Sequence, residues 1–212
     1  MSLQKIHLVS LSLLIALIFG GVAGADNLAA IDHYNKALDY ANEGKFLLAL
    51  NETDRALLEN QNFTLAHVTR AGILNALGRY DESLAASDQA IALNPNQSAA
   101  WNNKAYAMIH LGRYPEGLDA AERAAALDPA LTEAWVNKGT ALIALGRYEE
   151  AVAASEQALV LDPASEEAKK NRETAQEFLA KMSPTKTPLS VHGILGGVSL
   201  GAAACLAGRI RR

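Results

Sequence analysis

The sequence of 212 residues has one cysteine and few aromatic residues, which make up 6% of the chain. A single cysteine, Cys205, excludes an intramolecular disulfide and a zinc site built from several cysteines. Half of the residues are apolar and only 20% are charged, so the composition does not favour a disordered chain. The sequence also lacks a phosphate-binding loop, a dinucleotide fingerprint, a nucleophile elbow and an HExxH motif. We therefore expect a protein that is not an enzyme and that carries no cofactor or metal ion.

Negative charge is concentrated in the middle of the chain. Residues 30–182 contain 22 Asp and Glu residues against 14 Lys and Arg residues, a balance of −8, whereas the whole chain has a formal charge of −4. Nucleic acids present a dense array of phosphates, which an acidic region repels. Nucleic acid is therefore not an expected partner.

Two stretches of the central region match each other at a spacing of 34 residues. Trp101 and Trp135 begin these stretches. The same spacing relates Gly112 to Gly146, Tyr114 to Tyr148, Ala124 to Ala158 and Pro129 to Pro163. One period earlier the pattern continues with Leu77, Gly78, Tyr80, Ala90, Leu93 and Pro95, and two periods earlier with Gly44, Phe46, Ala49 and Ala56. The chain therefore contains four repeats, at residues 30–63, 64–97, 98–131 and 132–165.

Each repeat predicts two helices joined by a turn. In the last repeat, apolar residues recur at helical spacing on both sides of Gly146. This glycine suits the left-handed position that ends a helix, and Asp162-Pro163 ends the second helix. One hairpin cannot bury its own apolar face, so we expect the hairpins to stack. We interpret Trp101 and Trp135 as core residues of this stack rather than as platforms for a ligand.

The pattern of an aromatic residue, Leu-Gly-x-Tyr, Ala and Asp-Pro at a period of 34 resembles the tetratricopeptide repeat family. The resemblance implies an all-α fold, a right-handed α-solenoid of about four helix-turn-helix units within residues 30–182. Residues 166–182 predict a closing helix that is apolar toward the last repeat and charged outward. Ser165 would cap this helix, and Glu166 and Glu167 would occupy its first turn.

The N-terminal residues 1–25 have the features of a signal peptide. Lys5 and His7 precede an apolar run from Leu8 to Val22, and the small residues of 23–25 form a cleavage site. The run is short for a membrane span of about 20 residues. We therefore favour cleavage after Ala25 over an uncleaved membrane anchor.

The C-terminal residues predict a membrane attachment. Residues 183–188 form a linker with two prolines, and residues 189–208 contain no Asp, Glu, Lys or Arg and are long enough to cross a bilayer. Residues 209–212 contain three arginines, which favour the cytoplasmic side. The tail resembles C-terminal sorting signals of prokaryotic surface proteins, in particular those of methanogenic archaea. We expect secretion across the plasma membrane and anchoring at the cell surface, with the tail either kept as a transmembrane helix or cut and replaced.

The resemblance also implies a peptide-binding groove lined by the first helices of successive repeats. The residues placed there are Tyr34, Asn35, Leu38, Val68, Thr69, Asn75, Asn102, Asn103, Tyr106, His110, Val136, Asn137 and Thr140. Asn35, Asn103 and Asn137 occupy equivalent places, which Thr69 interrupts. Such a row of amides can pair with the backbone of an extended peptide or, alternatively, can hold neighbouring repeats together. The lysines and arginines with which some family members clamp a terminal carboxylate are missing from the corresponding positions.

Two further patterns concern glycosylation and metal binding. Asn51, Asn62 and Asn96 fit the N-glycosylation triplet, which is meaningful only if the chain is secreted. His33 and His67 stand where later repeats have tryptophan. Two histidines could begin a metal site, but no further ligand pattern accompanies them, so we favour aromatic packing.

These features together predict a membrane-tethered scaffold at the cell surface that binds a protein or peptide ligand in its groove. Two alternatives remain open. One is a structural protein of the cell envelope that associates with its own copies, and the other is an accessory subunit of an envelope enzyme or transporter.

Overall fold

The structure is a computed structural model that describes residues 23–182. Within these residues the chain forms nine α-helices and is all-α. Their bounds are α2 Ala23–Asn42, α3 Phe46–Glu59, α4 Thr64–Ala76, α5 Tyr80–Leu93, α6 Ser98–His110, α7 Tyr114–Leu127, α8 Thr132–Ala144, α9 Tyr148–Leu161 and α10 Glu166–Met182. The predicted linker, membrane segment and arginine cluster, and all but the last residues of the predicted signal peptide, lie outside the described residues. None of the described helices combines the length and the apolar character that a membrane span requires.

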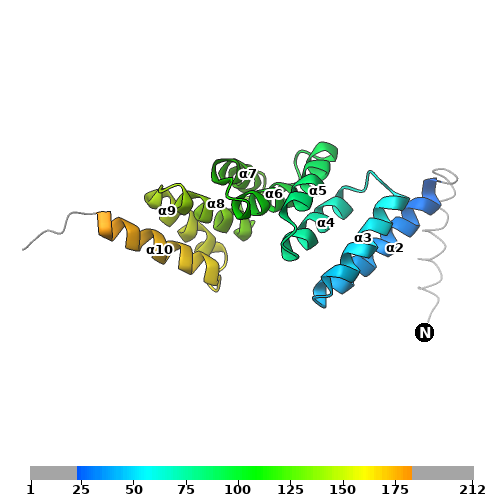
Figure 1. Cartoon of the computed structure of the whole chain (residues 1–212), viewed down its shortest axis with the longest axis horizontal. Coiled ribbons are helices and arrows are strands. Elements are labelled where there is room, and N and C mark those ends of the chain that lie inside the picture. Colours follow the sequence, from blue (N-terminus) through cyan, green and yellow to red (C-terminus); the bar gives the residue numbers. More distant parts are fainter. Residues whose placement is uncertain (1–22, 183–212) are drawn as a thin grey trace, which may run out of the picture. The chain divides into compact units, whose positions relative to one another are not determined.

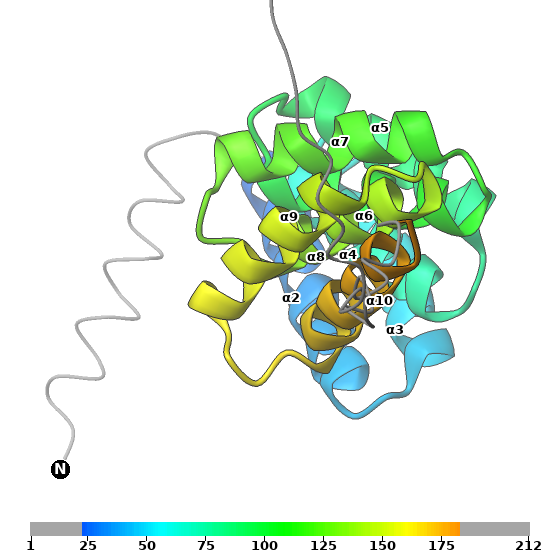
Figure 2. The same cartoon turned by 90° about the vertical axis from the view of Figure 1, so that its left-hand side faces the viewer.

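The helices form a solenoid of successive pairs. Each helix contacts the next one along the chain, and Figure 1 shows α2 to α10 following one another in sequence order. In addition, α4 contacts α6, α6 contacts α8, and α8 contacts α10. Figure 2 views these helices from the α10 end, with α4, α6, α8 and α10 grouped in the middle of the projection. The first helices of successive repeats therefore lie next to one another and form one continuous face, which α10 extends.

The turn inside each helix pair is built around a glycine. Gly44, Gly78, Gly112 and Gly146 all have a positive φ, between 72° and 74°. At Gly146 the amide donates to the carbonyl of Ile143, and the following Arg147 amide donates to Leu142 O at 2.9 Å. These bonds satisfy carbonyl groups that the end of α8 would otherwise leave unpaired. The predicted role of Gly146 as a helix terminator is confirmed.

The turn between successive pairs is built around an Asp or Asn side chain. Asp162 Oδ1 accepts the amide N–H of Ala164 at 2.9 Å, and Asp128 Oδ1 accepts that of Ala130 at 3.0 Å. Helix α9 ends at Leu161, just before Asp162-Pro163. The Ser165 hydroxyl then accepts the amide N–H of Ala168 at 3.3 Å, so Ser165 caps α10 as predicted.

Small side chains dominate the core between the helices. Most buried apolar residues are alanines, and the largest fully buried side chains are those of Leu74 and Leu142. A core of alanines allows the helix axes to come close, because little side-chain volume separates them. A methyl group added at Gly117 would lie only 2.8 Å from Ile109 Cγ1, which shows how tightly α6 and α7 pack.

The two tryptophans lie at the edge of this core and are partly buried. The rings pack against buried alanines, while Trp101 Nε1 donates to Pro95 O at 2.8 Å and Trp135 Nε1 donates to Pro129 O at 3.0 Å. His67 Nε2 makes the same contact, with Gln61 O at 2.9 Å. In three repeats, therefore, a ring nitrogen lies within hydrogen-bond distance of the carbonyl oxygen of the turn residue six positions earlier.

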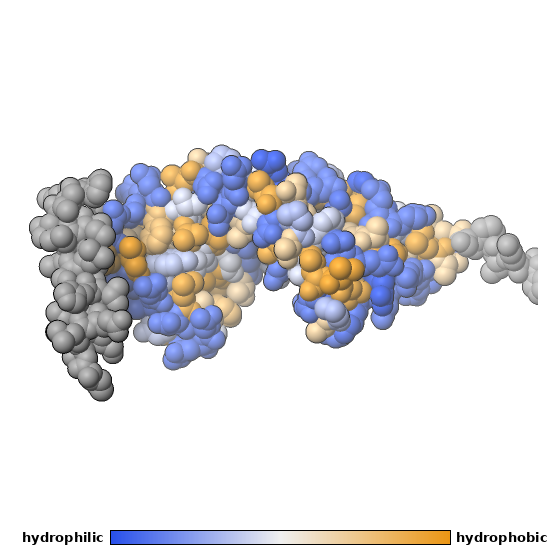
Figure 3. Space-filling model, turned by 180° about the vertical axis from the view of Figure 1, so that it is seen from behind, coloured by the Kyte–Doolittle hydropathy of each residue, from blue (hydrophilic) through white to orange (hydrophobic). Residues whose placement is uncertain are grey.

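His33 behaves differently from the other three residues at this position. Its Nδ1 lies 2.6 Å from Glu52 Oε2, so it bonds to a carboxylate of α3 instead of packing like an aromatic residue. Within residues 23–182 no cluster of three or more His, Cys, Asp or Glu residues is arranged to hold a metal ion. The surface seen in Figure 3 mixes hydrophilic side chains with smaller apolar areas.

Candidate binding groove

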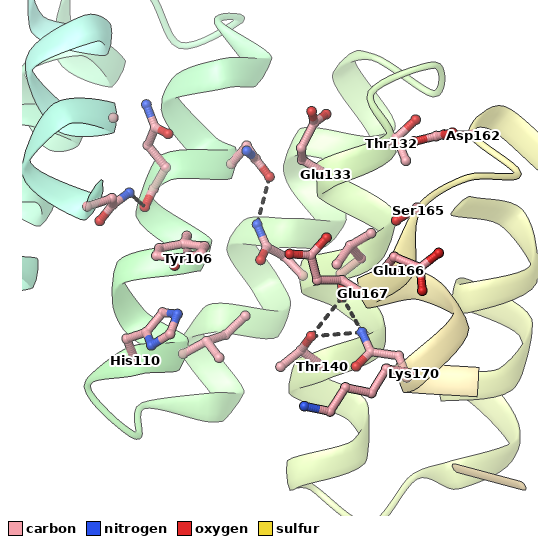
Figure 4. A pocket seen from close by; sticks show the side chains of 18 of the residues that line it. Tyr106, His110, Thr132, Glu133, Thr140, Asp162, Ser165, Glu166, Glu167 and Lys170 are labelled. Atoms are coloured by element: carbon pink, nitrogen blue, oxygen red, sulfur yellow. Dashed lines mark hydrogen bonds between the residues drawn. The ribbon is translucent and has the colours of Figure 1, made fainter. Parts of the chain in front are cut away.

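A hollow of about 990 Å³ lies on the face formed by the first helices. Its lining comes from α4, α6, α8 and α10 and from the turn that precedes α10. Neighbouring repeats contribute side chains to the same space because their first helices lie side by side. Figure 4 shows this hollow with Tyr106 and His110 on one side and residues of α10 on the other. We call this hollow the groove.

The groove contains eight of the thirteen side chains that the sequence assigned to a binding surface. They are Asn75, Asn102, Asn103, Tyr106, His110, Val136, Asn137 and Thr140. The five remaining residues, Tyr34, Asn35, Leu38, Val68 and Thr69, do not line it. Asn35 instead borders a separate hollow of about 540 Å³ on α2, and the Tyr34 ring packs against Phe63 at a centroid distance of 4.9 Å.

The groove also contains residues that the sequence analysis did not assign to it. They include Gly72, Glu133, Asp162, Glu166, Glu167, Lys170 and Asn171. The signal for Asn171 was present, because it follows Asn137 by one period of 34 residues. It was missed because residues 166–182 were interpreted as a closing helix only, whereas α10 also takes the place of a fifth first helix along the groove.

The asparagine row forms hydrogen bonds between successive repeats. Asn103 Nδ2 donates to Val68 O at 3.0 Å, and Asn75 Nδ2 donates to Asn103 O at 3.0 Å. Asn137 Nδ2 donates to Asn102 Oδ1 at 2.8 Å. Asn171 Nδ2 donates to the carbonyl of Val136 and to Thr140 Oγ1. These bonds favour the alternative in which the row holds the repeats together, and they use up donors that a peptide would otherwise meet.

Two amides that line the groove keep an oxygen without a partner. Asn75 is 8% exposed and Asn137 is 7% exposed, and both line the groove. Asn75 Oδ1 is buried and accepts no hydrogen bond. Among the described residues, no hydrogen bond reaches Asn137 Oδ1 either, since this amide only donates, to Asn102. The Asn75 oxygen is sealed from solvent, so a ligand in the groove cannot reach it, whereas the Asn137 oxygen keeps access to solvent and can accept an N–H from a ligand.

Three aromatic rings lie together at the α6 side, and two of them, Tyr106 and His110, line the groove. The His110 ring stacks on Tyr80 with centroids 4.8 Å apart and 9° between the planes, and it lies 4.3 Å from the Tyr106 ring. Burial lowers the pKa of His110 below its ordinary value and raises the pKa of Tyr106. Both side chains are therefore uncharged at neutral pH and offer ring faces to a ligand.

Carboxylates dominate the charge of the groove at its α8 and α10 end. Glu133, Asp162, Glu166 and Glu167 line it against one cation, Lys170. Glu166 is already paired with Lys169, at 2.7 Å. In Figure 4 the carboxylate of Glu167 points toward the side of Tyr106, whereas Glu166 points away from it. The arrangement contains aromatic faces, amides and carboxylates, which suit recognition of a ligand.

The predicted glycosylation residues are all accessible on the surface. Asn51 is exposed on α3, and Asn62 and Asn96 are exposed in the turns that precede α4 and α6. In both turns the backbone amide of this residue donates to the Asn side chain two residues earlier. Modification of these residues stays a prediction.

Comparison with known proteins identifies the repeats. Models of the tetratricopeptide repeat family match residues 73–132 and residues 132–165. No curated protein matches the chain. Residues 73–165 therefore consist of tetratricopeptide repeats, as the pattern of the sequence indicated.

Solved structures share this fold. MamA from Desulfovibrio magneticus is 22% identical, with 72% of this chain and 92% of that chain covered and a TM-score of 0.58. A thermophilic tetratricopeptide repeat protein from Thermus thermophilus is 20% identical, with 73% and 84% covered and a TM-score of 0.61. The first repeat domain of Spaghetti (RPAP3), solved with the HSP90 peptide SRMEEVD, is 26% identical, with 55% and 93% covered and a TM-score of 0.53.

Proposed function

We propose that this protein is a membrane-tethered scaffold at the cell surface that holds a segment of a partner protein in the groove. The observation that carries the proposal is that one hollow brings together the partly exposed Tyr106 ring, the Oδ1 of Asn137, which accepts no hydrogen bond within residues 23–182, and the carboxylate of Glu167. Polar and aromatic side chains that converge in one hollow without being used up by contacts inside the chain are typical of a ligand-binding surface.

The shape of the groove agrees with a peptide ligand. A volume of about 990 Å³ spread over four successive first helices fits an extended or helical segment of several residues. Peptide binding also occurs in a similar structure, since the Spaghetti domain was solved with an HSP90 peptide. The present groove differs from a carboxylate clamp in its charge, because carboxylates outnumber its one lysine.

The cellular location follows from the two ends of the chain and is part of the same proposal. The signal-like residues 1–25 would direct secretion, and residues 189–208 would attach the repeats to the membrane. Protease treatment of intact cells tests this: a protein on the outer surface loses its repeats, whereas a protein inside the cell stays intact.

Capture of partners by a chain with a filled groove tests the binding function. Ala76 is exposed at the end of α4 and lines the groove, and the equivalent positions are His110 in α6, Ala144 in α8 and Phe178 in α10. A large ring is therefore tolerated at this position, so Ala76→Trp should fold and fill part of the groove. Ala126→Trp makes the same change at an exposed site of α7 that does not line the groove.

We expect the parent chain and Ala126→Trp to capture the same partner from an envelope extract, and Ala76→Trp to lose it. Circular dichroism establishes that both variants are folded. Equal capture by all three chains would place the binding site outside the groove and contradict the proposal.

Self-association is a second candidate, and the first helix pair favours it. Leu28 and Leu47 are 70% exposed and Leu58 is 79% exposed, so the first helix pair presents several large apolar side chains to solvent. Light scattering of the purified chain over a hundredfold range of concentration tests this candidate. A mass that grows with concentration, and that Leu47→Ser and Leu58→Ser reduce to that of one chain, would support it.

A further inference from the structure

The unpaired polar groups that face the groove are mostly hydrogen-bond acceptors. Asn137 Oδ1 accepts no hydrogen bond, and the carboxylate of Glu167 forms no ion pair, among the described residues. The Nδ2 of Asn137 is already used, in a bond to Asn102 of the preceding repeat. The chemistry that completes this site is therefore a ligand rich in N–H groups and positive charge.

An aromatic ring and a carboxylate face each other across the groove. Tyr106 belongs to α6 and is 38% exposed, so part of its ring is open to a ligand. Figure 4 shows Glu167 of α10 with its carboxylate turned toward the side of Tyr106. The negative charge of Glu167 also contributes to the raised pKa of Tyr106, which is consistent with this placement.

We propose that the groove recognises a basic extended segment of a partner protein and holds one of its arginine side chains between the Tyr106 ring and the Glu167 carboxylate. This inference rests on the proposed function and adds the charge of the ligand and the residues that recognise that charge. The planar guanidinium stacks on the face of the Tyr106 ring and at the same time donates hydrogen bonds to the Glu167 carboxylate. The floor oxygen of Asn137 accepts a further N–H of the bound segment.

Arginine fits this arrangement better than lysine. Its planar group stacks on an aromatic ring and presents five donors in a fixed plane, whereas an ammonium group is a compact point charge that stays more strongly hydrated. A neutral residue such as glutamine has donors but no charge, so it gains neither the ring interaction nor the ion pair. The site therefore ranks peptides in the order arginine, lysine, glutamine and glutamate.

Lys170 is the one cation of the groove and lies one helical turn after Glu167. The two side chains form no ion pair of 4 Å or less. Lys170 nevertheless repels a positively charged ligand, so its removal strengthens binding. Glu166 offers a matched control for Glu167, since it is the neighbouring residue on α10 but pairs with Lys169 and points away.

Fluorescence anisotropy with the full chain in mild detergent tests the inference. The probes are capped ten-residue peptides in which three arginines alternate with alanine and serine, and identical peptides with lysine, glutamine or glutamate at those positions. We expect the arginine peptide to bind at least tenfold more tightly than the glutamine peptide. Glu167→Gln should weaken it by about 10- to 100-fold, Glu166→Gln by less than about twofold, and Lys170→Gln should strengthen it.

The outcomes separate this inference from the proposed function. Equal binding of the arginine and glutamine peptides, with both lost in Ala76→Trp, would overturn the charge preference while groove binding stands. Equal loss in Glu166→Gln and Glu167→Gln would assign the effect to the overall charge of α10 and overturn the arginine site. Growth of the chain's mass without peptide, abolished by Glu167→Gln, would assign the groove to a second copy and overturn the partner class.

Discussion

Replacing asparagine by alanine at equivalent positions of two repeats separates the contribution of one hydrogen bond from the effect of helix propensity. Asn103 and Asn35 occupy the same place, two periods apart, and both lie inside a helix. Asn103 Nδ2 donates to Val68 O at 3.0 Å, whereas the exposed Asn35 side chain makes no hydrogen bond within residues 23–182. We therefore predict that Asn103→Ala destabilises the fold and that Asn35→Ala does not.

The magnitude follows from the one bond that differs. A hydrogen bond of this kind contributes about 0.5–1.5 kcal/mol to the free energy of unfolding. The gain in helix propensity from Asn to Ala, up to about 0.7 kcal/mol, is the same for both variants and cancels when they are compared. For a chain of this size a difference of about 1 kcal/mol corresponds to about 2–4 °C in Tm.

Thermal unfolding followed by circular dichroism measures this difference. We expect Asn103→Ala to melt about 2–4 °C below Asn35→Ala, with equal helix content in both variants before unfolding. If both variants melt at the same temperature, the bond between Asn103 and Val68 does not stabilise the stack, and the interpretation of the row as a link between repeats is wrong.

Three further predictions follow from particular contacts. Gly117→Ala should cost about 1–3 kcal/mol in urea unfolding, because its methyl group would lie 2.8 Å from Ile109 Cγ1, whereas Gly72→Ala meets no atom closer than 3.7 Å and should be neutral or stabilising. An NMR titration should place the pKa of His110 below its ordinary 6.5, because burial disfavours the charged ring. As the pH falls, the unfolded state therefore takes up a proton on His110 before the folded state does. The contribution of His110 to stability is thus present above pH 6.5 and is lost as the pH falls below it. Urea unfolding at pH 7.5 and at pH 5.5 measures this loss. Raising the salt concentration from 50 to 500 mM should weaken the arginine peptide and should reduce the gain from Lys170→Gln, which titrations at both concentrations measure.

The repeat pattern was sufficient to predict the fold of the repeats. Gly146 and Asp162-Pro163 predicted where two helices end, and the structure ends them there because a positive φ and a proline leave little choice. Such rules act on neighbouring residues, so a single sequence carries them fully. For His67 the period predicted a role like that of the tryptophans, and its ring makes the same contact with a turn carbonyl, which the sequence analysis did not specify.

The groove was only partly predictable, because it depends on contacts between repeats. Asn103 and Asn137 were assigned to a binding surface, with a role in holding repeats together as the alternative, but the local pattern did not indicate which atoms their N–H groups would meet. Glu167 looked like an ordinary residue of a first helical turn, favoured there by the helix dipole. Its place opposite Tyr106 follows from how α10 packs against α8, which periodicity alone does not specify.

The bonds of the asparagine row also bear on the pitch of the solenoid. Asn171 reaches back to Val136, and Asn103 reaches back to Val68, in each case over 35 residues. These bonds link consecutive first helices from within the proposed binding surface. A substitution that removes one of them is therefore expected to change the curvature of the solenoid together with the contacts offered to a ligand.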